Sequence, residues 1–75
     1  MRVSDVAYEK IKMMIITARL RPGQTLVEAE LMEELGMGRT PIREALNRLA
    51  WENFVKIDPR QCIMVNEISL YEVES

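Results

Sequence analysis

Residues 35–46, with the sequence LGMGRTPIREAL, constrain the fold of this chain more than any other segment. Gly36 suits the left-handed position that ends a helix, and a new helix start follows within about three or four residues, as in a helix-turn-helix. After Pro41 the apolar side chains recur at helical spacing and define one buried face; they are Ile42, Ala45, Leu46, Leu49 and Ala50. The segment therefore predicts two helices joined by a short turn.

The third predicted helix carries a second, polar face. Arg39, Arg43 and Asn47 recur every four residues away from the apolar face. One face suits a hydrophobic core and the other a polar, anionic partner, as a recognition helix in a DNA major groove requires. The net charge of −2 argues against a generic nucleic-acid binder, but residues 37–61 hold five basic and three acidic side chains. The remaining residues hold five basic and nine acidic ones.

Composition excludes several classes of protein. Seventy-five residues suffice for one small domain, and a hydrophobic fraction of 48% is enough for a single core. No apolar run approaches the length of a membrane span, and the lone Cys62 excludes an internal disulfide and fits a reducing cytoplasm. The chain has no histidine, so a conventional zinc site or a histidine-assisted nucleophile is not expected. We therefore expect that the protein is not an enzyme and that it binds no metal ion and no cofactor.

Local signals outline the helices. Ser4 is a candidate N-cap for a first helix with Asp5 in its first turn and an apolar stripe, and residues 21–23 (Arg-Pro-Gly) are expected to end it. Residues 25–27 predict a very short strand, and residues 28–35 a second helix. The third helix has two allowed starts: Thr40 as cap with Pro41 in the first position, or Gly38 as cap with Arg39 and Thr40 in the first turn. Asn53 is expected to end it in the left-handed conformation.

Two apolar segments, 54–57 and 62–65, flank the turn segment Asp58-Pro59-Arg60-Gln61 and predict a β-hairpin. Packed on three helices, and joined by residues 25–27, this hairpin would be the wing of a winged helix-turn-helix. The expected fold class is therefore α+β, with three helices and a small antiparallel β-sheet. Trp51, Phe54 and the methionines are assigned to the core by default.

The last residues predict the start of another helix. Ser69 and Glu72 form a capping box, and Ile68 and Val73 occupy the positions of a hydrophobic staple. Because so short a helix is unstable alone, we expect residues 1–67 to be the winged helix-turn-helix domain and residues 68–75 to be a linker and the start of a truncated C-terminal helical domain. The alternative is a frayed tail with a chance match.

The chain resembles a known family of bacterial regulators. Residues 21–28 (RPGQTLVE) are similar to the "PG..L.E" segment of GntR-family transcription regulators, and residues 31–49 to that family's "LA..LGVSRTPVREAL..L" core. The "RTPxREAL" portion resembles the FadR-like (FCD) branch, whose C-terminal effector domain is all-helical. The resemblance implies a repressor-type regulator that binds an inverted-repeat operator as a homodimer through a C-terminal domain missing here, with a small-molecule effector bound in that domain.

Three positions depart from the family pattern. Gly38 stands where the family usually has serine or threonine, Cys62 where the wing commonly has glycine, and Ala29 where some relatives have a basic residue. The change at Cys62 puts a close approach of the wing to the minor groove in doubt. The change at Ala29 likewise puts in doubt a contact between the second helix and the DNA backbone.

The candidate DNA-binding residues lie at the turn, on the third helix and in the wing; they are Gly38, Arg39, Thr40, Arg43, Asn47, Arg60 and Gln61. Arg39 is the first choice for reading a guanine, and Thr40 and Arg43 for a phosphate or a neighbouring base edge. Asn47 could serve the DNA or the solvent, and Arg60 and Gln61, with Lys56, could touch the DNA backbone or form a bare turn.

Arg48 is interpreted as surface support, paired with Glu44 four residues before it. The DNA interpretation requires the guanidinium groups of Arg39 and Arg43 to be neither buried nor screened by glutamates of the preceding helix. Glu30, Glu33 and Glu34 must therefore point away from the DNA. The main rival is a winged-helix module that binds another protein, which the acidic balance favours.

Overall fold

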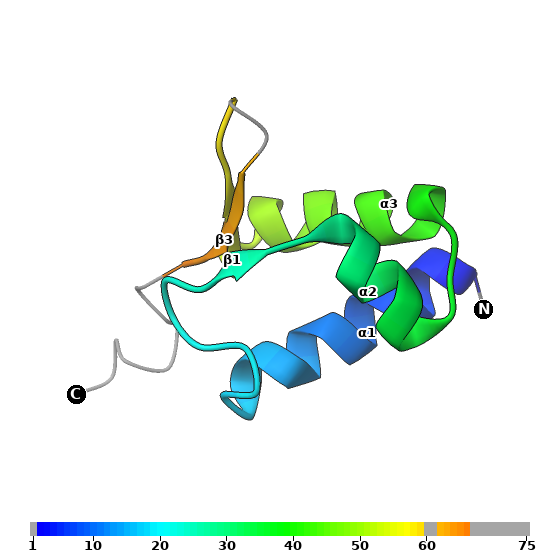
Figure 1. The fold of residues 1–75 in the computed structure, drawn as a ribbon, viewed down its shortest axis with the longest axis horizontal. Coiled ribbons are helices and arrows are strands. Elements are labelled where there is room, and N and C mark those ends of the chain that lie inside the picture. The colour runs from blue at the N-terminus through cyan, green and yellow to red at the C-terminus, as the bar shows by residue number, and fades with distance from the viewer. Residues whose placement is uncertain (1, 60–61, 67–75) are drawn as a thin grey trace.

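The described part of the computed structural model, residues 2–59 and 62–66, contains three helices and three strands (Figure 1). In chain order these are α1 (Val3–Ile16), β1 (Thr25–Leu26), α2 (Glu28–Leu35), α3 (Arg39–Trp51), β2 (Val55–Ile57) and β3 (Ile63–Val65). The bounds of α2 match the predicted helix, and each strand falls within a segment predicted to be extended. The fold is the predicted winged helix-turn-helix.

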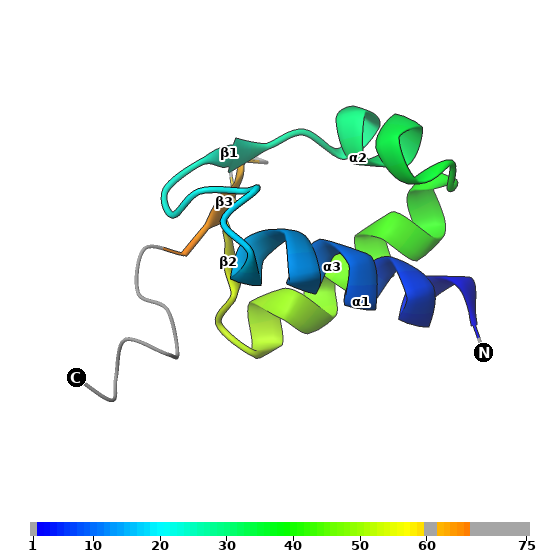
Figure 2. The ribbon, with the colours of Figure 1, turned by 90° about the horizontal axis from the view of Figure 1, so that it is seen from below.

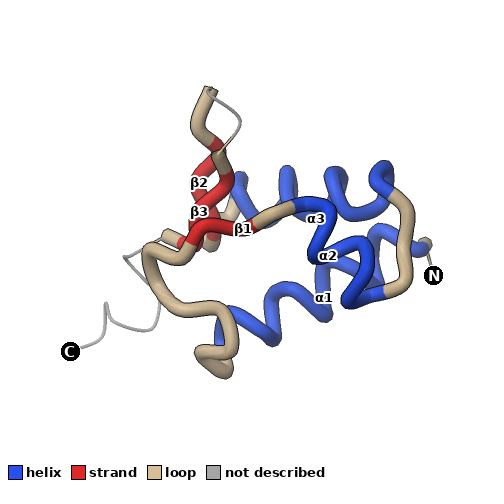
Figure 3. The backbone as a smooth tube through the Cα atoms, viewed as in Figure 1, coloured by secondary structure: helices blue, strands red, loops and turns tan. Residues whose placement is uncertain are grey.

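The three strands form one antiparallel sheet in the order β1-β3-β2. Met64 of β3 lies opposite Lys56 of β2 on one side and Thr25 of β1 on the other. Backbone hydrogen bonds between Gly23 and Val65, and between Val65 and Gln24, each 2.8 Å long, extend the pairing before β1. Figure 3 shows the strands gathered at one end of the molecule, with the β2–β3 hairpin projecting past the helices.

The core forms where α1 crosses α3 (Figure 2) and where α3 meets the sheet at β2. From α3, Ile42, Ala45 and Leu49 are fully buried and Leu46 is 1% exposed, which confirms the predicted apolar face. Helix α1 contributes Ala7, Tyr8, Ile11 and Ile15, and the remaining buried hydrophobic residues are Leu20, Leu26, Leu31, Val55 and Val65. Met14, Met32, Met37 and Phe54 pack against this cluster while partly exposed.

Both ends of α1 differ from the prediction. The helix begins at Val3 with Arg2 as its N-cap, and Ser4 is 8% exposed within the first turn. Ser4 lies at helical spacing from Ala7, Tyr8 and Ile11, so its burial against the protein outweighs its capping preference. At the other end the helix stops at Ile16, before the predicted Arg-Pro-Gly.

The early stop of α1 has a local cause that the sequence does not signal. Ala18 adopts the left-handed conformation with φ of 64°, and the Leu20 amide donates to the carbonyl of Met14 at 3.0 Å. This turn brings Leu20 into the core, where it is 8% exposed. Burial of Leu20 therefore accompanies a left-handed alanine that local preference disfavours.

The prediction that Trp51 and the methionines lie in the core is wrong for Met13, which is 51% exposed, and for Trp51. Its side chain lies on the last turn of α3 and is 87% exposed. On the helical wheel it falls with Thr40 and Glu44, away from the stripe of Ile42 and Leu49. The hydrophobicity of the residue was misleading, whereas its position in the 3.6-residue period predicts the exposure. Asn53, with φ of 67°, takes the left-handed conformation as predicted.

Polar contacts link side chains of α1 to the C-terminal end of α3. The Tyr8 hydroxyl donates a hydrogen bond to the carboxylate of Glu52. Arg48 Nη1 lies 2.8 Å from Asp5 Oδ1, and its guanidinium carbon lies 4.0 Å from the centre of the Tyr8 ring. Lys12 Nζ lies over the same ring at 5.4 Å. These contacts tie together two helices that are far apart in sequence.

The tail prediction lies outside the described residues. The capping box at Ser69 and Glu72 and the proposed domain boundary at residue 67 fall in the range 67–75, which is not described. The division into residues 1–67 and 68–75 therefore stays a prediction.

Tyr8 predicts a loss of stability in alkali. Its hydrogen bond to Glu52, and secondarily its burial, raise the pKa of the phenol above the ordinary value of 10.0. A raised pKa in the folded state means that the stabilisation is complete below about pH 10 and is lost as the pH rises through the higher folded pKa. We expect the stability difference between wild type and Tyr8→Phe, measured by urea unfolding from neutral pH upward, to shrink in that range. A difference that stays constant with pH would contradict this account.

Candidate nucleic-acid interface

The turn between α2 and α3 places the first residues of the candidate interface. Gly36 ends α2 in the left-handed conformation with φ of 66°, as predicted. Gly38 is the N-cap of α3, with φ of −77° and ψ of 175° and no side-chain capping bond. Of the two starts left open by the sequence, the structure has the Gly38 cap, so Arg39 and Thr40 lie in the first helical turn and Pro41 is the third helical residue.

The two candidate arginines are exposed on one face of α3. The side chain of Arg39 is 63% exposed and that of Arg43 is 61% exposed. Arg39 begins the helix, whose first turn holds no acidic residue. A cation at the positive end of a helix dipole is disfavoured, so this arrangement does not serve helix stability. It concentrates positive charge on the exposed first turns of α3, where an anionic partner can bind.

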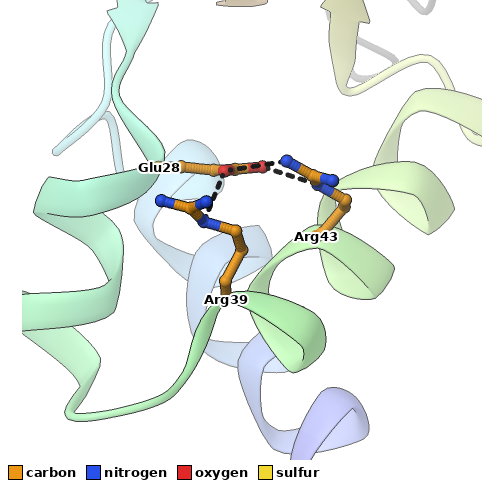
Figure 4. Close-up of polar contacts among 3 residues, drawn as sticks. All are labelled: Glu28, Arg39 and Arg43. Carbon is orange, nitrogen blue, oxygen red and sulfur yellow. Dashed lines mark hydrogen bonds and ion pairs between the residues drawn. The ribbon is translucent and has the colours of Figure 1, made fainter.

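Figure 4 shows that both guanidinium groups converge on the carboxylate of Glu28, the first residue of α2. Arg43 Nε lies 3.1 Å from Oε2 and Arg43 Nη2 lies 3.4 Å from Oε1. Arg39 Nε lies 3.6 Å from Oε1. The two guanidinium groups are exposed as required, but the requirement that no glutamate of the preceding helix screen them is not met, because Glu28 pairs with both. Because two guanidinium groups share one carboxylate, a net positive charge remains.

The screening does not come from the glutamates that the sequence singled out. Glu34 pairs with Arg19 at 3.6 Å, and in the part of the chain that the structure describes Glu30 and Glu33 form no ion pair with Arg39 or Arg43. Sequence reasoning missed Glu28 as a site residue. The one signal available was its place in the "PG..L.E" family segment, which gives no hint of its partners.

The contact with Glu28 also affects the Arg43 guanidinium. The hydrogen bond to Glu28, and then the charge of Glu28, raise the pKa of the Arg43 guanidinium above its ordinary value. The side chain therefore stays a cation at every pH at which DNA is a duplex. Because both arginines are exposed, water screens the ion pairs, and their contribution to folding is small.

Beside the arginines a groove of about 620 Å³ runs between α3, the start of α2 and the β2–β3 hairpin. Arg43 and Asn47 line it from α3, and Glu28 lines it from α2. Ile57 and Cys62 form part of the hairpin wall. The structure thus brings Arg43 and Asn47 together with the wing, while Thr40 is exposed on the first turn of α3.

The wing residues are only partly placed. Arg60 and Gln61 lie outside the described residues, so their predicted contacts stay predictions. Lys56 is exposed on β2. Arg48 is a support residue as predicted, but its partner is Asp5, and no ion pair with Glu44 occurs within the described ranges. The i to i+4 rule missed this pairing because the α1–α3 packing offers Arg48 both a carboxylate and an aromatic ring.

Two further properties describe this surface. Among the described residues, no group of three or more histidine, cysteine, aspartate or glutamate side chains is placed to hold a metal ion. In the same part of the chain, no helix is long and apolar enough to cross a membrane. The site offers instead guanidinium, hydroxyl and amide donors on one helix, which suit the recognition of phosphates and base edges.

Comparisons with known proteins agree with this geometry. Residues 3–65 match the family described as bacterial regulatory proteins, gntR family. An uncharacterized HTH-type transcriptional regulator from Agrobacterium vitis is 38% identical over 73 residues, which is 97% of this chain and 42% of that protein. The HTH-type transcriptional regulator McbR of Escherichia coli is 36% identical over 64 residues, 85% of this chain and 29% of that protein.

Solved structures give the same result. The structure of E. coli McbR/YncC superimposes with a TM-score of 0.82 at 31% identity, covering 99% of this chain and 35% of that one. The chain belongs to the GntR family of bacterial transcriptional regulators, whose members named here are regulators with a helix-turn-helix and not enzymes. It spans 42% and 29% of the lengths of these two curated relatives.

The Gly38 cap predicts a stabilising substitution. A Cβ at Gly38 would meet no heavy atom within 4 Å, and a serine hydroxyl there could accept from the Thr40 amide, since Pro41 has no N–H. Gly38→Ser should raise the free energy of unfolding by roughly a few tenths of a kcal/mol in urea titrations. Gly36→Ser is the matched control, because φ of 66° strains any side chain and should cost about 1 kcal/mol. Equal effects at the two glycines would refute this assignment of caps.

Proposed function

We propose that this chain is the sequence-specific, double-stranded DNA-binding domain of a metabolite-responsive transcriptional regulator. The observation that carries the proposal is the pair of exposed guanidinium groups, Arg39 and Arg43, on the first turns of a helix whose opposite face is fully buried. A helix held in this way enters a major groove with its N-terminal residues foremost. Membership in the GntR family supports the same assignment.

Each candidate residue has a proposed role. Arg39 reads a guanine through O6 and N7, while Thr40 and Arg43 contact a phosphate or the next base edge. The Gly38 backbone lets the helix start approach the DNA closely, and Asn47 extends the contact along α3. Arg60 and Gln61, which lie in the sequence between the two hairpin strands, are proposed to touch the DNA backbone, a contact that positions the domain without reading sequence.

The whole protein is proposed to act as a homodimer in the bacterial cytoplasm. Residues 68–75 would lead into a C-terminal helical domain of the FadR-like type, which would form the dimer and bind a small-molecule effector. A two-fold dimer presents two recognition helices to the half-sites of an inverted-repeat operator. Effector binding would change the dimer geometry and release the operator, as in a repressor.

Selection from random duplexes with the full-length protein tests the proposal. We expect one palindromic consensus, because a symmetric dimer reads two equal half-sites. Binding should also weaken steeply with salt, since each phosphate contact releases counterions. The rival, a winged helix that docks on another protein, would yield no consensus and no salt-dependent binding to duplexes.

Arg39→Ala tests the readout role. We expect a loss of roughly 1–3 kcal/mol on the selected operator and relaxed selectivity at one guanine, measured by fluorescence anisotropy on operator variants. Arg19→Ala is the control, because Arg19 is equally exposed but pairs with Glu34 away from α3. Equal losses on selected and random duplexes would make Arg39 a phosphate contact instead.

A further inference from the structure

Glu28 does more than neutralise charge at the candidate interface. We propose that Glu28 is a specificity-determining positioning residue. It lowers the affinity of the Arg39/Arg43 pair for phosphates and leaves Arg43 able to read a base. This inference rests on the proposed DNA-binding function and adds a residue outside the recognition helix to it.

The first support is the fixed position of the carboxylate. Glu28 begins α2, where the helix dipole favours a negative charge, and its side chain is only 20% exposed. The two arginines around it are more than 60% exposed. The carboxylate lies between the two guanidinium groups (Figure 4) and is less exposed than either of them, so an incoming duplex contacts the cations more readily than the anion.

The second support is the choice of donors. A guanidinium has five N–H donors arranged along its edges. Arg43 gives Glu28 the edge formed by Nε and Nη2. The edge formed by Nη1 and the other hydrogen of Nη2 is not used in this contact. A two-point contact with Glu28 also fixes the plane of the guanidinium, so the remaining edge is held ready for the paired acceptors of a guanine.

The third support is electrostatic. A phosphate that binds Arg39 or Arg43 comes close to the Glu28 carboxylate, and two anions repel each other unless the ion pair breaks. The O6 and N7 atoms of guanine are uncharged acceptors and carry no such penalty. Glu28 therefore weakens sequence-independent attraction to the DNA backbone more than it weakens base contacts, which raises the ratio of specific to non-specific affinity.

Glu28→Gln in the full-length protein tests this inference, because it keeps the shape of the side chain and removes its charge. Affinity for a random duplex should rise by roughly three- to tenfold at low salt, with a steeper salt dependence. Affinity for the selected operator should rise less or fall, so the ratio of operator affinity to random-duplex affinity decreases. Glu30→Gln is the matched control, since Glu30 lies in the same first turn of α2 and forms no ion pair with Arg39 or Arg43.

The possible outcomes are distinct. An equal rise on both duplexes for Glu28→Gln, or the same changes for Glu30→Gln, would reduce Glu28 to a general negative charge and overturn the inference. A fall on both duplexes with an unchanged ratio would also overturn it. If the wild-type protein bound no duplex at all, the proposed function itself would fail, and the inference with it. Thermal melting of each variant confirms that the fold is intact.

Discussion

The packing of α3 against α1 is the contact on which the rest of the structure depends. Four side chains of one stripe, Ile42, Ala45, Leu46 and Leu49, are at most 1% exposed. Their burial fixes the rotation of the helix about its axis, so the face with Arg39 and Arg43 has to point outward. A helix of this length is marginal alone in water, so its stability comes from the same packing that orients its polar face. The core and the candidate interface are thus two consequences of a single constraint.

Most of the fold could be predicted because its signals are local. The apolar period of α3, the left-handed Gly36 and Asn53, and the bounds of α2 each follow from a few neighbouring residues. The errors arose where tertiary contacts outweighed local preference. Ser4 has a good capping side chain but is buried in the first turn, and α1 stops early at a left-handed Ala18 that no glycine announces.

The arginines of the candidate site could be predicted from the sequence, but the glutamate that pairs with them could not. Arg39 and Arg43 were recognised because they share a helical face and a family motif. Glu28 lies on another helix, and its pairing with them depends on how α2 and α3 are placed across the turn at residues 36–38. The partner of Arg48 could not be predicted for the same reason, since Asp5 is 43 residues away in sequence. Spacing rules within one helix cannot find partners of this kind.

The strand order has a consequence for how the protein is made. β3 is the last strand among the described residues, yet it is the central strand of the sheet, between β1 and β2. During synthesis on the ribosome, the backbone groups of both earlier strands must therefore wait for residues 63–65 to emerge. The three helices leave the ribosome before then and hold most of the core residues. A nascent chain would accordingly acquire its recognition helix before its wing, and the sheet would be completed only after residues 63–65 have left the ribosome.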